Sequence, residues 1–131
     1  MIQRERLAND FEAMSQFTGP GEGIHRLAFT DADWAGRQYI IDRMIDAGLT
    51  VETDGFGNVI GYKLGKNPEL PVVMVGSHTD SVPNGGNYDG VVGVLSAIEV
   101  IRSMNDDGFE YDHTIAVVSF MCEESGRFGD A

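Results

Sequence analysis

Residues 72–80 have the sequence VVMVGSHTD, and residues 114–124 have the sequence TIAVVSFMCEE. Each stretch has an unbroken apolar run at or next to its start, residues 72–75 and 115–118, which is typical of a strand covered on both faces. Between them, residues 90–104 repeat an apolar side chain every third or fourth position, so they predict a helix. Strand, helix and strand form a βαβ unit, whose strands are parallel and whose crossover is right-handed. The sequence therefore predicts an α/β fold.

The residues before this unit predict two further helices and a hairpin. Apolar side chains recur at helical spacing over residues 2–17 and again over residues 31–47. Residues 49–64 predict an antiparallel hairpin around a glycine-rich turn. The expected fold is therefore a mixed sheet flanked by helices, with parallel central strands at residues 72–77 and 114–121.

The expected helix over residues 31–47 has a recognisable start and a predicted buried face. Thr30, followed three residues later by Asp33, resembles a capping box with Asp in place of Glu. Trp34 and Ile45 belong to the apolar face, so we expect both side chains in the core.

Composition limits the classes of partner. The 131 residues include 9 Lys+Arg and 21 Asp+Glu, for a net charge of −12. Nucleic acids and anionic membranes are therefore excluded as partners, because both need clustered basic residues. The longest apolar runs, residues 71–75 and 115–118, are far shorter than the ~20 residues of a membrane span.

Cysteine content points to an intracellular protein. Cys122 is the only cysteine, which excludes an internal disulfide and a thiolate zinc cage. The charged residues 1–6 precede no apolar signal core. We therefore expect a soluble, cytoplasmic protein.

Five polar residues are predicted to meet at one rim of the sheet. His78 and Asp80 follow the first strand of the βαβ unit, Glu123 and Glu124 follow the second, and Asp89 precedes the helix. Sites in open parallel sheets lie beyond the carboxyl ends of the strands. Carboxylates gathered around one histidine need a positive charge among them, and mixed His/carboxylate ligation suits Zn, Mn, Co or Ni. The rim therefore predicts a divalent-metal site.

Each of these residues also has an ordinary alternative. Asp89 could cap the helix that follows it, and Glu123 and Glu124 could form a solvated turn. His78 could be a hydrogen-bonded residue at a strand end, with Asp80 on the same face two residues later. Only their joint placement favours the metal site.

Two motifs resemble those of a known family. Residues 76–95, GSHTDSVPNGGNYDGVVGVL, and residues 122–129, CEESGRFG, resemble the metal-binding and Glu-Glu motifs of the hydantoinase/carbamoylase amidases. These are the N-carbamoyl-L-amino-acid hydrolases and allantoate amidohydrolases, within the aminoacylase/dinuclear metallopeptidase clan. Residues 23–27 and 57–61 are similar to the family's N-terminal pattern, so the likeness covers nearly the whole chain. The short gap between the histidine and the aspartate suits this branch.

The resemblance implies a role for each rim residue. His78 would bind one metal ion, Asp89 would bridge two ions, and Glu124 would bind the other. Glu123 would be the general base that activates water and then protonates the leaving nitrogen, and Asp80 would orient His78. These last two are the expected catalytic residues, whereas the residues that bind substrate stay unassigned.

The implied reaction is hydrolysis of an N-carbamoyl-L-amino acid to the amino acid, ammonia and carbon dioxide. It would use two divalent ions, drawn from Zn, Mn, Co or Ni, and a small ureido or carbamoyl substrate. Allantoate is the first alternative substrate, and peptide or acyl-amino-acid hydrolysis is the next.

The ligand set in this chain is incomplete. Two ions need about four or five ligands each, and the family supplies two further histidines that this sequence does not place. His25 has no motif support, and His113 precedes the strand whose far end, roughly 26 Å away, carries the site.

We therefore expect residues 1–131 to be the N-terminal part of a catalytic domain. The remaining catalytic sheet and the lid and dimerisation region would be absent, and the full-length enzyme would be a homodimer. The chain alone would be inactive and bind at most one ion. The alternative of another class is a binding or scaffold module, which predicts self-association through unpaired sheet edges.

Overall fold

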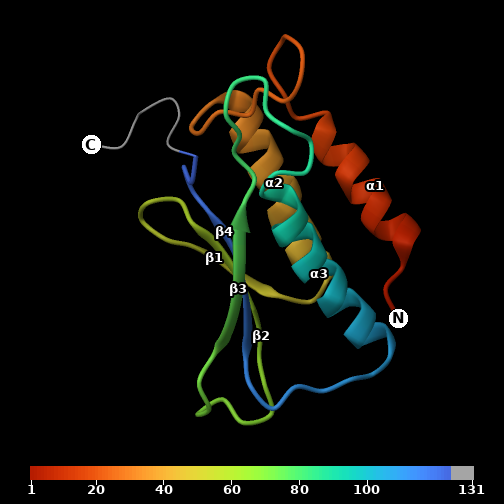
Figure 1. The fold of residues 1–131 in the computed structure, drawn as a ribbon. Coiled ribbons are helices and arrows are strands. Elements are labelled where there is room, and N and C mark those ends of the chain that lie inside the picture. Colours follow the sequence, from red (N-terminus) through yellow and green to blue (C-terminus); the bar gives the residue numbers. More distant parts are fainter. Residues whose placement is uncertain (125–131) are drawn as a thin grey trace.

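Four strands form one mixed sheet in residues 1–124, the part of the chain that the computed structural model describes (Figure 1). The helices are α1 (Arg4–Ser15), α2 (Asp31–Asp46) and α3 (Val91–Asp106). The strands are β1 (Thr50–Thr53), β2 (Val59–Lys63), β3 (Val73–His78) and β4 (Ile115–Phe120). The α/β class is confirmed, and each expected element is present with ends shifted by at most two residues.

The order of the strands in the sheet is β1-β2-β4-β3. The expected hairpin β1–β2 is antiparallel, and β2 also pairs antiparallel with β4. β3 and β4 are parallel, with Val73 opposite Ile115 and His78 opposite Phe120. The carboxyl ends of these two strands therefore lie side by side.

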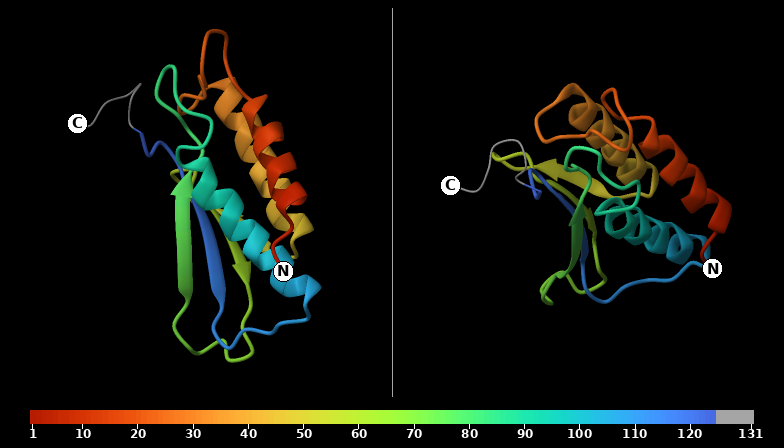
Figure 2. Two further views of the ribbon diagram at one scale, coloured as in Figure 1. Left: turned by 45° about the vertical axis from the view of Figure 1, so that its right-hand side comes forward. Right: turned by 45° about the horizontal axis from the view of Figure 1, so that its top comes forward.

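β3 corrects one detail of the predicted sheet. It lies at the edge of the described sheet, and Val73, Met74 and Val75 are 46%, 56% and 44% exposed. The helices cover one face of the sheet (Figure 2), and no strand within residues 1–124 pairs with the outer edge of β3. Of the two parallel strands, only β4 is central, with Ala116, Val117 and Val118 buried.

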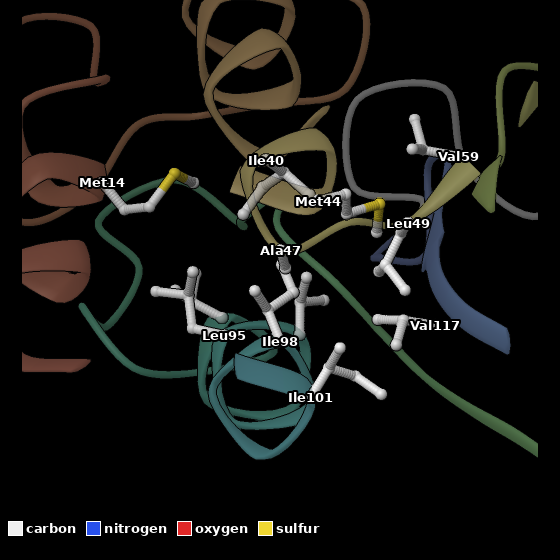
Figure 3. Packing of buried hydrophobic residues seen from close by; sticks show 12 residues of the cluster. Met14, Ile40, Met44, Ala47, Leu49, Val59, Leu95, Ile98, Ile101 and Val117 are labelled. Carbon is white, nitrogen blue, oxygen red and sulfur yellow. The ribbon is translucent and has the colours of Figure 1, made fainter. Parts of the chain in front are cut away.

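The core lies between the sheet and the helices (Figure 3). α2 packs on β1 and β2, α3 packs on β3 and β4, and α1 packs on α3. The apolar face expected for α3 is buried as predicted. The buried cluster consists of Met14, Ile40, Met44, Ala47, Leu49, Val59, Val91, Val94, Leu95, Ile98, Ile101 and Val117.

Two side chains of α2 were wrongly predicted to be buried. Trp34 is 50% exposed and Ile45 is 56% exposed. The buried stripe of α2 instead begins with two charged residues, Asp33 and Arg37, whose guanidinium lies 4.3 Å from the centre of the Trp34 ring. The buried face of α2 therefore differs from the predicted one, because a pattern of apolar residues does not register buried charged residues.

The start of α2 departs slightly from a capping box. The Asp33 amide donates to the Thr30 hydroxyl, as expected, but the Asp33 carboxylate accepts from the Phe29 amide.

None of the helices in the described residues is both long enough and apolar enough to cross a membrane.

Candidate metal centre

The carboxyl ends of β3 and β4 bring all five predicted rim residues together. Nε2 of His78 lies 3.3 Å from Oε2 of Glu123 and 3.6 Å from Oε1 of Glu124. The same nitrogen lies 3.5 Å from Oδ1 of Asp89, and Nδ1 lies 3.5 Å from Oδ1 of Asp80. One imidazole is thus surrounded by four carboxylates, as the topology predicted.

The backbone around α3 gives His78 its space. Gly90 is the N-cap of α3, has a φ of +74°, and lies so close to His78 that a Cβ atom would be 2.5 Å from the ring. Only glycine fits this conformation and this contact without strain. No side chain caps α3, so the alternative in which Asp89 only caps the helix does not occur here.

Asp80 connects the two halves of the rim. Its carboxylate is buried, and its two oxygens accept from the amides of Glu123 and Glu124 at 3.2 and 3.0 Å. Nδ1 of His78 lies 3.0 Å from the carbonyl oxygen of Asp80. A proton on Nδ1 leaves the lone pair on Nε2, which faces the other three carboxylates.

The electrostatics of the rim favour a positive charge. The hydrogen bond with Asp80 raises the pKa of His78 from 6.5 to about 9, although burial acts against it. Burial alone would raise the pKa of Asp80, but hydrogen bonds from His78 and the two glutamate amides hold that pKa below its usual value. Burial raises the pKa of Glu124. The rim therefore meets the electrostatic condition for a cation site.

Three of the five residues fit a single metal ion. One potential ligand atom from each of His78, Asp89 and Glu124 lies within 4.8 Å of the other two. One imidazole nitrogen and two carboxylates are a donor set that suits Zn, Mn, Co or Ni. These are the residues for which the resemblance implied metal ligation.

The other two histidines make contacts away from the rim. Nε2 of His25 lies 2.8 Å from the Glu22 carbonyl, and Nδ1 of His113 lies 2.7 Å from the Pro71 carbonyl at the opposite end of the sheet. Within residues 1–124, neither belongs to a group that could hold a metal ion.

Sequence reasoning missed two residues that contact residues 78–79, at the end of β3. Gly90 contacts the His78 ring, and Arg26 is buried with its Nε atom 2.7 Å from the Thr79 carbonyl. A signal existed for both, because each lies in a stretch that carries the family resemblance. Neither has the chemistry of a ligand or a base, so a search for reactive groups passes over them.

Comparisons with known proteins agree with the resemblance. The model of Peptidase family M28 matches residues 58–130. N-carbamoyl-L-amino-acid amidohydrolase from Pseudomonas sp. (strain NS671) is 43% identical over 98% of this chain. Ureidoglycolate hydrolase from Arabidopsis thaliana is 42% identical over 94% of it. A solved hydantoinase/carbamoylase family amidase from Burkholderia multivorans covers 96% of the chain, with 43% identity and a TM-score of 0.91. The expected likeness to these amidases is confirmed.

This chain is much shorter than the proteins that it matches. It spans 31% of the Pseudomonas relative, 26% of the Arabidopsis relative and 31% of the Burkholderia multivorans chain. The match thus extends over nearly all of this chain but over only about a quarter to a third of each relative.

Proposed function

This chain belongs to Peptidase family M28, and on that premise we propose that it supplies part of the metal centre of a hydrolase that cleaves carbamoyl C–N bonds. The observation that carries the proposal is the group formed by His78, Asp89 and Glu124, whose ligand atoms lie within 4.8 Å of one another. The amidohydrolase names of relatives at 40% identity and above support the class of reaction.

In this proposal, three residues hold divalent ions. His78 would be a ligand of one ion, Glu124 a ligand of the other, and Asp89 a ligand shared by both. Asp80 orients His78 and, through the amides of Glu123 and Glu124, holds the other side of the rim. The chemistry that divalent ions supply in such a site is polarisation of the substrate carbonyl and a lower pKa for water.

Glu123 is the general base of the proposed reaction. Its carboxylate is half-exposed and belongs to the rim, yet it lies outside the group of three ligand atoms. It takes a proton from the water that attacks the carbamoyl carbon and gives it to the amino-acid nitrogen as the C–N bond breaks. The carbamate that is released decays to ammonia and carbon dioxide.

In the same proposal, the remaining metal ligands come from outside these 131 residues. Two ions need about four or five ligands each, more than the described rim provides. The relatives contain many residues that this chain does not match, and in the proposal such residues supply the further ligands, a lid and a dimer contact. We place the enzyme in the cytoplasm, on the support of the single cysteine among these 131 residues, and as a homodimer, on the support of the family likeness.

A second substrate class is supported by one specific observation. The Arabidopsis relative named ureidoglycolate hydrolase is 42% identical, nearly as close as the Pseudomonas N-carbamoyl-L-amino-acid amidohydrolase at 43%. Ureido acids such as allantoate are therefore the second candidate, because they contain the same carbamoyl C–N bond.

The test uses the longest polypeptide that the source cell makes from this sequence, purified with Mn²⁺. Ammonia release is measured with N-carbamoyl-L-amino acids and with allantoate, and release of free amino acids is measured with a dipeptide. We expect turnover of a carbamoyl substrate, a 10²–10⁴-fold lower kcat for Glu123→Gln, and loss of bound metal in His78→Ala. Cleavage of the dipeptide alone, or an unchanged kcat in Glu123→Gln, would contradict the proposal.

A further inference from the structure

A short N-terminal segment, residues 24–26, is paired with the loop that joins β3 to α3. Ile24 and Gly85 exchange two backbone hydrogen bonds, of 2.9 and 2.8 Å. The Ser81 amide donates to the Arg26 carbonyl at 2.8 Å, and the Arg26 amide donates to the Ser81 hydroxyl at 2.9 Å. The segment thus acts as a strap: it is hydrogen-bonded across the loop that carries two of the rim residues, Asp80 and Asp89.

The side chain of Arg26 connects this strap to the rim itself. Its Nε donates to the carbonyl of Thr79 at 2.7 Å, and Thr79 is the residue between His78 and Asp80. Its Nη1 donates to the carbonyls of Met14 and Phe17 at the end of α1, at 2.7 and 2.6 Å. The guanidinium therefore joins α1 to the peptide that separates the two rim residues.

The environment of Arg26 is unusual for an arginine. The residue is 1% exposed, and the hydrogen-bond partners recorded for its guanidinium in the described residues are backbone carbonyls. Burial lowers the pKa of Arg26, while the charges of Asp33 and Asp80 act in the opposite direction. Burying a cation is costly unless its donors are satisfied, and these carbonyls accept from three of the five N–H donors of the guanidinium.

We propose that Arg26 is a positioning residue of the metal centre. By fixing the Thr79 carbonyl, it sets the turn of the backbone after His78. That turn places the Asp80 carboxylate against the amides of Glu123 and Glu124. The consequence for metal binding rests on the proposed function, whereas the effect on the geometry of the rim does not.

A purely structural role would have a different signature. If Arg26 only closed the end of α1, its loss would loosen α1 and leave the amides that Asp80 binds unchanged. Arg102→Met is the matched control, because Arg102 is also largely buried and ties α3 to α1 through Asp10 but makes no contact with Thr79. Ser81→Ala is a milder second variant that weakens the strap while leaving the guanidinium in place.

The experiment is hydrogen exchange, measured by NMR on the 131-residue chain. In Arg26→Met we expect at least about 10-fold faster exchange at the amides of Ser81, Glu123 and Glu124. We expect a smaller change of the same pattern in Ser81→Ala, and no change at the two glutamate amides in Arg102→Met. If Arg26→Met unfolds the chain, Arg26→Lys replaces it, because a lysine ammonium keeps the charge but lacks the planar fork that holds the three carbonyls. The proposal would be overturned if the exchange rates of the two glutamate amides stay unchanged in the folded variants. It would also be overturned if these amides exchange equally fast in Arg102→Met.

A Zn²⁺ titration by calorimetry separates this proposal from the proposed function. We expect Arg26→Met to weaken Zn²⁺ binding about 10–100-fold, the range typical of residues that orient ligands, and Arg102→Met to leave it unchanged. If the wild-type chain binds no Zn²⁺, the metal proposal fails for this chain, and the exchange pattern still decides whether Arg26 positions the rim.

Discussion

Gly90 shows how one missing side chain shapes the candidate site. A Cβ atom there would lie 2.5 Å from the His78 ring, and the residue has a φ of +74°. We expect Gly90→Ala to displace the imidazole and to strain the backbone by about 1–3 kcal/mol. The measurement is Zn²⁺ affinity by calorimetry, which should fall about 10-fold or more.

Gly108 provides the matched control for this substitution. It also has a positive φ, +69°, but no atom lies within 4 Å of the position of its missing Cβ. Gly108→Ala should therefore lower thermal stability through backbone strain and leave Zn²⁺ affinity unchanged. Equal losses of affinity in the two variants would show that strain, and not the contact with His78, is responsible.

α1 is attached to α3 by a buried carboxylate. Glu99 on α3 is 0% exposed and accepts from Nε and Nη2 of Arg6 at 2.7 and 2.9 Å. The Gln3 amide and the Ser103 hydroxyl also donate to it, each at 2.9 Å. Burial alone would raise the pKa of Glu99, but these partners outweigh it and lower the pKa from 4.5 to about 2. The attachment of α1 therefore depends on the charge of Glu99.

Glu99→Gln should destabilise the chain in a pH-dependent way. The folded pKa of Glu99 lies below its ordinary value, so its contribution is complete above pH 4.5 and decreases as the pH falls towards about 2. The shift corresponds to about 3 kcal/mol. Urea unfolding of wild type and variant at pH 7 and pH 3 measures it, and we expect the smaller difference at pH 3.

Glu110→Gln is the control for the change in net charge. Its carboxylate is 74% exposed and lies 3.9 Å from Lys66, so its removal should cost less than about 1 kcal/mol at either pH. An equal loss at pH 7 and pH 3 in Glu99→Gln would mean that packing, and not the ionised carboxylate, holds α1 to α3.

Most of the fold follows from the hydrophobic pattern, because local periodicity decides between helix and strand. The buried face of α3 and the parallel pairing of β3 with β4 were predicted in this way. Topology alone then brought His78 and Asp89 to one rim. The burial of Glu99 and Arg26 was not predictable, since each is buried only because distant residues satisfy its charge. The edge position of β3 likewise depends on which strands the chain contains, and an apolar run of residues does not reveal that.

An exposed apolar surface lies along β3. A groove of about 380 Å³ between β3 and α3 is lined by apolar side chains that include Val73, Val75 and Val100. Met74, between the two valines of the strand, is 56% exposed. Residues 73–77 contain neither a charged residue nor a proline, and these are the residues that protect natural edge strands from pairing.

Purified on its own, this chain should therefore self-associate through β3. Sedimentation equilibrium should show a weight-average mass that rises with concentration, and Met74→Lys should suppress the rise, because a charge on an edge strand opposes pairing. Leu64→Lys is the control, since Leu64 is 71% exposed and lies outside β3. Both variants make the net charge of −12 less negative and so reduce general repulsion between chains. A loss of association in Met74→Lys alone must then come from the strand edge, whereas a wild-type chain that stays monomeric at every concentration would show that β3 is protected.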